Sequence, residues 1–407
     1  MRPRSVQGSI AVIGAGVAGC ACAAQLRRQG FSGPISLWEV GRGPGGRAST
    51  RRSRADEELA IDHGAPLLNI TADPAPALLE PLLAGGWIAP WSGLMALLEG
   101  ESKLHIGRPD MLGQGDLYVG VGGMDGLCRG LLDLAAQGEG SAISPHYRTL
   151  IRSLDVSDTG TWRLWDGTGG LLGQADWLVL SSTLLAHPRS CLLFDWPAVP
   201  MAEAAAKLAD LQLDHALTTI AGIRAEARSN LLLIVPEDDA LLWRALPFTL
   251  VNFDAAAQQC WGLRRISIQP LADGRCAVVA HSSDAFAADH LDVYGSRSAV
   301  ARLLALPPDS GREEEVIEAL SQAVLQCLAP WIDAASLERA SPQLMRWGAA
   351  FPVAPGLPQA LMLCPRSRVG FCGDYLAGQG FGRIEGALRS AEHLAGALLQ
   401  AGLDSRT

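Results

Sequence analysis

The sequence predicts an α/β protein whose two domains are interleaved along a chain of 407 residues. Three observations indicate this fold class. A short apolar strand, a glycine turn and a helix follow one another from residue 9. A uniformly apolar run at residues 177–181 is typical of a buried parallel strand. The same strand, glycine loop and helix pattern returns at residues 369–399, after a middle segment of different character. The length suffices for two domains with separate cores.

The first glycine turn has the spacing of a dinucleotide-binding unit, and a second short strand ends in Glu39. Gly14 permits a tight turn, Gly16 lets the backbone approach a pyrophosphate, and Gly19 lets helix and strand pack closely. Ala18 lies in the first turn of the helix, where free N–H groups attract phosphate. Glu39 is placed to accept hydrogen bonds from a ribose hydroxyl. We therefore expect a Rossmann-type unit rather than a structural glycine turn.

The loop after Glu39 favours FAD over NAD as the bound dinucleotide. In a simple NAD-binding unit, the second strand would lead into another amphipathic helix. Here Val40 leads into a run of glycines and arginines that cannot form a regular helix. Gly45 and Gly46 can approach a ligand closely, and Arg47 can donate to phosphate or ribityl oxygens through its rigid fork. A flexible, solvated surface loop is the alternative interpretation.

Composition and charge narrow the class of partner. The net charge of −9 gives no electrostatic case for binding nucleic acid or an anionic membrane. No apolar run reaches the roughly 20 residues that a membrane-spanning helix needs. The nine cysteines and eight histidines show no metal-ligand spacing and no C-x-x-C pair, so we expect no metal site, reduced thiols and a cytoplasmic protein. The expected partner is a small-molecule substrate.

The other elements follow from apolar periodicity and turn signals. Short apolar or alternating runs predict strands at residues 61–62, 147–156, 161–166, 177–181, 216–223, 231–235, 264–269, 276–280 and 369–373. Apolar residues at helical spacing, or acids in a first turn, predict helices that end near Ala136 and that cover residues 201–211, 313–328 and 384–399. Residues 71–118, which carry many Pro, Leu and Gly, are expected to form loops and short helices. We assign an FAD-binding domain to residues 1–70, 119–185 and 346–407, and a substrate domain to residues 71–118 and 186–345.

The C-terminal segment contributes further candidate cofactor residues. Asp374 follows Gly373 at a strand end, where its carboxylate can accept hydrogen bonds from ribityl or ribose hydroxyls. The helix that starts near Arg383 and Ile384 would direct its positive end at flavin N1 and C2=O, which stabilises an anionic reduced flavin. An ordinary turn acid is the alternative for Asp374. Glu385 either contacts the cofactor or pairs with the helix dipole.

Together these segments resemble the bacterial renalase family of FAD-dependent oxidoreductases, within the flavin amine oxidase superfamily. The motifs that carry the resemblance are Gly14/Gly16/Gly19, Gly45-Gly46-Arg47, Ile61-Asp62-His63-Gly64-Ala65, Tyr118-Val119-Gly120 with Gly123-Met124, Trp162-Arg163-Leu164, Met345-Arg346-Trp347, Gly373-Asp374 and Gly382 to Ala387. The resemblance implies a two-domain amine oxidase-like fold with the flavin ring at the domain interface, and it adds Asp62, Gly64 and Ala65 to the cofactor residues. It also implies hydride transfer from dihydronicotinamide isomers to flavin N5, with reoxidation by O2.

The expected substrate side departs from that pattern. Relatives carry a glutamine and an aromatic residue where Pro66 and Leu67 stand, and residues 181–185 replace a Pro-rich segment. Arg383 stands where amine oxidases usually carry an aromatic residue, and it would repel a protonated amine. The chain has only two lysines, Lys103 and Lys207, whereas some amine oxidases use a lysine near the flavin.

We take Arg383 and His63 as candidate catalytic residues, with loop anchoring and a structural role as their respective alternatives. Hydride transfer to flavin N5 mostly requires that the substrate be positioned and desolvated, so a dedicated acid or base need not exist. Two other functions stay open: a superfamily oxidoreductase or desaturase acting on an apolar or amine substrate, and a non-catalytic scaffold that binds flavin or a prenyl group.

Overall fold

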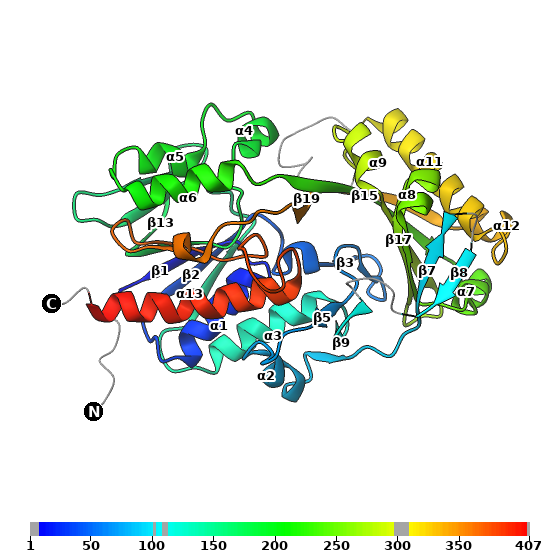
Figure 1. Ribbon diagram of the computed structural model, residues 1–407, viewed down its shortest axis with the longest axis horizontal. Coiled ribbons are helices and arrows are strands. Elements are labelled where there is room, and N and C mark those ends of the chain that lie inside the picture. Colours follow the sequence, from blue (N-terminus) through cyan, green and yellow to red (C-terminus); the bar gives the residue numbers. More distant parts are fainter. Residues whose placement is uncertain (1–7, 101–102, 108–112, 297–308, 405–407) are drawn as a thin grey trace.

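The computed structural model describes residues 8–100, 103–107, 113–296 and 309–404. These residues form two parts, each built on a large β-sheet (Figure 1). The fold class predicted from the sequence is confirmed: a Rossmann-type part and a mixed α+β part are interleaved along one chain. Among the described residues, no helix has both the length and the apolar character needed to cross a membrane.

The first part is a six-stranded sheet covered by helices. Its strands, in spatial order, are β10 (Ile143–Tyr147), β2 (Ile35–Glu39), β1 (Ile10–Ile13), β14 (Trp177–Leu180), β21 (Val369–Phe371) and β20 (Leu363–Cys364). The pairs from β10 to β21 are parallel, and β20 is antiparallel. Helix α1 (Val17–Arg28) packs between α3 (Asp125–Ala136) and α13 (Ile384–Asp404). The strand order reverses beside β1, and ligands of such sheets bind outside the carboxyl ends of the strands at this switch point.

The second part is a seven-stranded sheet. Its strands, in spatial order, are β19 (Ser341–Pro352), β15 (Ala225–Val235), β18 (Cys276–Ser282), β17 (Leu263–Pro270), β16 (Leu250–Phe253), β7 (Met95–Glu99) and β8 (Lys103–Ile106). One face packs on α7 (Glu237–Arg244), α8 (Ala255–Trp261) and α11 (Ser310–Leu328), and buries Leu231, Ile266 and Val278 with Leu320. The other face packs in part against Leu59 and Ile61 of the first part. This second face therefore points toward the first part.

Shorter elements complete the chain. They are η1 (Gly46–Ala48), β3 (Thr50–Arg52), β4 (Ala60–Asp62), β5 (Leu68–Ile70), α2 (Leu79–Ala84), β6 (Ile88–Pro90), β9 (Asp116–Gly120), β11 (Ser153–Val156), β12 (Trp162–Trp165), β13 (Leu171–Ala175), α4 (Arg189–Phe194), α5 (Pro200–Ala205), α6 (Leu211–Ala221), α9 (Asp284–Asp289), α12 (Ala335–Glu338) and η4 (Gln359–Leu361).

Four expectations about secondary structure were wrong. The helix expected over residues 201–211 is α5, which ends at Ala205, and residues 147–156 are strand only at the end of β10 and in β11. Residues 216–223 are not a strand but the end of helix α6 and the turn that follows it. Asp210 caps this helix by accepting hydrogen bonds from the N–H groups of Gln212 and Leu213, and its buried residues Leu213, Leu217 and Ile220 follow helical spacing. The segment 71–118, expected to be loops and short helices, also supplies strands β6, β7 and β8.

The domain boundaries proposed from the sequence stay a prediction. The stretch from α4 to α6, in the segment assigned to the substrate domain, buries Trp196, Met201 and Ile220 in the same cluster as the first sheet. Strand β19 crosses the boundary that we expected at residue 346 and pairs with β15 of the second sheet.

Candidate active site

A cavity of about 400 Å³ is lined by residues of both parts. From the first part it is lined by Gly14, Gly16, Ala18, Glu39, Val40, Gly45, Gly46, Arg47, Gly64, Ala65, Gly373, Asp374, Arg383 and Ile384, all candidate residues from the sequence. From the second sheet it is lined by Arg228, Asn230, Leu250, Arg265 and His281. The candidates Gly19, Asp62 and His63 do not belong to its lining.

The three glycines of the first turn have different physical roles. Gly14 has a φ of +104°, and a Cβ there would lie 2.5 Å from Ser181 Oγ. A Cβ on Gly19 would lie 2.0 Å from the Gly14 carbonyl oxygen. A Cβ on Gly16 would meet nothing nearer than Gly46 Cα at 3.9 Å. The protein's own packing therefore requires Gly14 and Gly19, whereas Gly16 leaves open space beside the N-terminus of α1, which has no side-chain cap.

Glu39 is held at the end of β2 by two backbone donors. Its Oε2 accepts a hydrogen bond of 2.8 Å from Ala15 N, and its Oε1 accepts one of 2.6 Å from Gly41 N. Burial raises the pKa of Glu39 above its ordinary value, although these two N–H donors oppose the shift. Each carboxylate oxygen keeps a lone pair, so the group can still accept a ribose hydroxyl.

Arg47 and Asp374 contact each other across 327 positions of sequence. Arg47 Nη1 and Nη2 donate to the two Asp374 oxygens at 2.6 and 2.5 Å, and Nη1 also donates to the Ala350 carbonyl at 2.8 Å. The bidentate pair joins the glycine–arginine loop to the loop after β21 and to β19. The sequence predicts that each side chain faces a ligand; in the structure the two side chains pair with each other.

Arg383 is anchored by a buried carboxylate. Glu385 is fully buried and accepts hydrogen bonds from Thr71 N, Ala72 N and Thr71 Oγ1 at 2.6–2.9 Å. Arg383 Nη2 lies 2.6 Å from Glu385 Oε2, while its buried Nε and Nη1 have no hydrogen-bond partner among the described residues. Glu385 thus anchors the start of α13, and Arg383 belongs to the cavity wall with two of its donors buried.

His63 lies behind the cavity wall. Its ring stacks on Trp347 with 5.4 Å between centroids, and Nε2 lies 3.3 Å from Ser49 Oγ. Burial, assisted by the Arg51 charge, lowers the pKa of His63 to about 4. The ring is therefore neutral near pH 7, and this geometry favours the structural role over the catalytic one.

The neighbouring candidates shape the loop that His63 belongs to. Asp62 Oδ1 accepts hydrogen bonds from Thr50 Oγ1 at 2.6 Å and Met124 N at 2.8 Å. A Cβ on Gly64 would lie 2.0 Å from the Arg47 carbonyl oxygen, to which Ala65 N donates at 2.8 Å. Asp62 therefore holds Thr50 and Met124 outside the cavity lining. Gly64 and Ala65 line the cavity and pack against the glycine–arginine loop.

The polar residues of the second sheet were missed at the sequence level. Arg228, Asn230, Arg265 and His281 come from β15, β17 and β18, which carry no recognisable motif. Within one strand, alternation shows which residues share a face of that strand. Only the pairing register of strands far apart in the sequence shows that these four side chains lie on the same face of the sheet.

A Rossmann-type unit and a mixed sheet that share one cavity define a two-domain α/β class. Residues 12–82 match the family model described as an NAD(P)-binding Rossmann-like domain. No curated protein matches the chain in sequence.

Solved structures match over nearly the whole chain. Cyclohexylamine oxidase from Brevibacterium oxydans IH-35A has a TM-score of 0.62 at 13% identity, covering 97% of this chain and 99% of that one. An oxidoreductase from Methanosarcina mazei has a TM-score of 0.59 at 13% identity, covering 94% and 98%. Putrescine oxidase bound to putrescine has a TM-score of 0.59 at 12% identity, covering 98% and 100%. The fold is therefore the two-domain fold of the flavin amine oxidases.

Proposed function

We propose that the protein is an FAD-dependent oxidoreductase that takes hydride from a small, electron-rich substrate. The observation that carries this proposal is the continuity of the cavity. It runs from the dinucleotide turn at Gly14 and Gly16 to the polar face of the second sheet at Asn230 and His281. A dinucleotide held by the turn would extend toward the sheet, where a substrate would meet its reactive end.

The residues of the first part fit FAD. Gly16 leaves room for a pyrophosphate at the N-terminus of α1, and Glu39 suits the adenine ribose. The Arg47–Asp374 pair and the N-terminus of α13 suit the ribityl chain and the pyrimidine edge of the ring. Bound FAD would supply the hydride acceptor, and the proposed reoxidant is O2, which would be reduced to H2O2.

The charges of the cavity argue against a protonated amine as substrate. Among the described residues, five arginines and two acids line it. Neither lysine of the chain, Lys103 or Lys207, belongs to the lining. Carboxylates behind the lining pair with two of these arginines, Glu385 with Arg383, and Glu226 and Asp284 with Arg228. Asp374 in the lining is itself paired with Arg47. Among the described residues of the substrate side, an ammonium group would therefore meet guanidinium groups and no unpaired carboxylate, whereas a neutral heterocycle needs no such partner. We therefore propose the dihydronicotinamide isomers as the first substrate class to test, in keeping with the renalase resemblance.

The test is a spectrum followed by a titration. The purified protein should show the absorbance of oxidised flavin, and anaerobic addition of 2-, 4- or 6-dihydronicotinamide should bleach it with at least one isomer. Putrescine and cyclohexylamine serve as comparison reductants and should leave the flavin oxidised. Full flavin occupancy without bleaching by any dihydronicotinamide isomer would refute the substrate class. A protein that neither carries nor binds FAD would refute the function and favour a non-catalytic scaffold.

A further inference from the structure

A row of polar side chains crosses the sheet face that lines the cavity. In the strand register Asn230 pairs with His281, His281 with Arg265, and Arg265 with Asn252. Directly paired residues share a face, so the four side chains form one line across β15, β18, β17 and β16. All four are buried, with at most 7% of any of them exposed. Arg228 precedes Asn230 by two positions and shares its face.

The row contains fixed hydrogen-bonding atoms that lack partners. Asn230 Nδ2 donates to the His63 carbonyl at 2.6 Å, which orients the amide and leaves Oδ1 as a buried acceptor without a partner among the described residues. His281 Nε2 and Arg228 Nε are likewise buried and unpartnered in the described part of the chain. Buried polar atoms are almost always hydrogen-bonded, so a hydrogen-bonding group, supplied by a ligand or by water, is expected at these three atoms.

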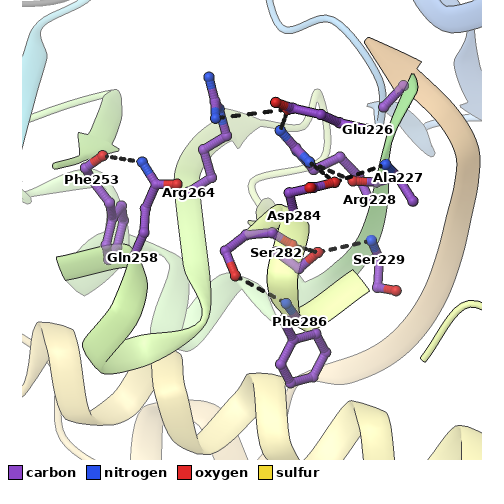
Figure 2. Close-up of polar contacts among 12 residues, drawn as sticks. Glu226, Ala227, Arg228, Ser229, Phe253, Gln258, Arg264, Ser282, Asp284 and Phe286 are labelled. Carbon is purple, nitrogen blue, oxygen red and sulfur yellow. Dashed lines mark hydrogen bonds and ion pairs between the residues drawn. The ribbon is translucent and has the colours of Figure 1, made fainter. Parts of the chain in front are cut away.

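Two carboxylates already balance the charge of Arg228. Figure 2 shows its guanidinium between Glu226 and Asp284; Nη2 donates to Glu226, and Nη1 lies 3.5 Å from Asp284 Oδ1. Nη1 also donates to the Ala227 carbonyl at 2.5 Å. The remaining Nε–H therefore acts as an oriented donor rather than as an uncompensated positive charge.

We propose that Arg228, Asn230 and His281 recognise an amide-type group of the substrate, such as a carboxamide, a lactam or a ureide. The N–H of that group donates to Asn230 Oδ1, and its C=O accepts from Arg228 Nε–H, with His281 Nε2 beside the pair. A carboxylate has no N–H, so one of its oxygens would face Asn230 Oδ1 and be repelled. The inference rests on the proposed function. It adds the chemical group of the substrate that these three residues recognise.

Two isosteric probes separate these chemistries: benzamide and benzoate. Flavin content is measured first, and binding to the flavin-containing protein is then followed by calorimetry and by the change in flavin absorbance. We expect benzamide to bind at least about tenfold more tightly than benzoate. The reason is that benzamide gains a buried hydrogen bond to Asn230 Oδ1, whereas a benzoate oxygen is repelled by the same atom. Asn230→Ala should weaken benzamide about tenfold, leave benzoate unchanged or improved, and retain the flavin.

Matched variants keep the result interpretable. Gln343→Ala is the control, because Gln343 Oε1 is also buried and unpartnered among the described residues. Gln343 lies on the same sheet face as Asn230 but does not belong to the cavity lining. This variant should therefore leave the benzamide preference intact. Arg228→Lys keeps the charge but removes the Nε–H donor, and should lose the preference as Asn230→Ala does. Thermal unfolding checks that each variant is folded.

Several results would overturn the inference. They are equal or tighter binding of benzoate, no binding of either probe, or an unchanged ratio in Asn230→Ala. Loss of flavin in Asn230→Ala would assign the row to the cofactor instead of the substrate. Because a protein without flavin fails before any probe is added, failure of the proposed function is distinguishable from failure of the amide assignment.

Discussion

The open space at Gly16 makes a sharp prediction about cofactor binding. In Gly16→Ala the added methyl group meets no protein atom nearer than 3.9 Å, and the φ of −74° at this residue is accessible to alanine. The apo protein should therefore be as stable as the parent or up to about 1 kcal/mol more stable, because alanine restricts the unfolded chain. The methyl group occupies the space where we expect the pyrophosphate, so FAD affinity should fall at least tenfold, or about 1.4 kcal/mol.

Gly19→Ala is the matched control, since it adds the same methyl group one turn away. Its Cβ would lie 2.0 Å from a backbone oxygen that cannot move aside freely, so the free energy of unfolding should fall by about 1–3 kcal/mol. The assay combines chemical denaturation of the apo proteins with FAD titration followed by fluorescence quenching. Parent-like FAD affinity in Gly16→Ala, or equal destabilisation by the two substitutions, would refute the assignment of Gly16 to the pyrophosphate.

Three further predictions concern groups whose partners the structure defines. A double-mutant cycle on Arg47→Ala and Asp374→Ala, measured by chemical denaturation, should give a coupling energy of about 1–2 kcal/mol in the free energy of unfolding. The pair is bidentate, which strengthens it, yet partly exposed, which weakens it. Additive effects of the two substitutions would contradict this coupling. The folded-state pKa of His63 is depressed to about 4, so its contribution to stability is present above pH 6.5 and is lost, by up to about 3 kcal/mol, as pH falls toward 4. His63→Gln should flatten that part of the stability–pH profile, and an unchanged profile would assign it to other groups. Replacing Lys103 and Lys207 together by methionine should leave the rate of flavin reduction unchanged in stopped-flow measurements, and a loss of more than tenfold would show that a lysine takes part.

The first strand–turn–helix unit was predictable because its signals are local. Gly14, Gly16 and Gly19 lie within six positions, and the geometry of one strand–turn–helix unit dictates their spacing. The Arg47–Asp374 contact was not predictable in this way, although both residues were candidates. Each was interpreted as facing a ligand, because nothing in either motif indicates that loops 327 positions apart meet.

Helix α6 shows a different limit of prediction from sequence. Residues 216–223 alternate well enough to suggest a strand, yet the residue that decides the outcome is Asp210, which caps the helix from upstream of that window. The polar row of the second sheet is a third case. Asn230, His281 and Arg265 meet only because three strands pair in one register, and a shift of one residue in any strand would turn its side chain to the opposite face.

The His63 backbone connects the first part to the second sheet beside the cavity. Its carbonyl accepts hydrogen bonds from Asn230 Nδ2 at 2.6 Å and from Trp347 Nε1 at 3.2 Å, both on the second sheet. The next two residues, Gly64 and Ala65, line the cavity from the first part. The carbonyl therefore fixes the distance between the loop beside the expected flavin and the amide that we assign to substrate recognition. Since a side-chain substitution leaves this carbonyl in place, His63→Gln should retain the benzamide preference even as it changes the pH dependence of stability. The motif residue would then act through its main chain, as a positioning residue, and not through its imidazole.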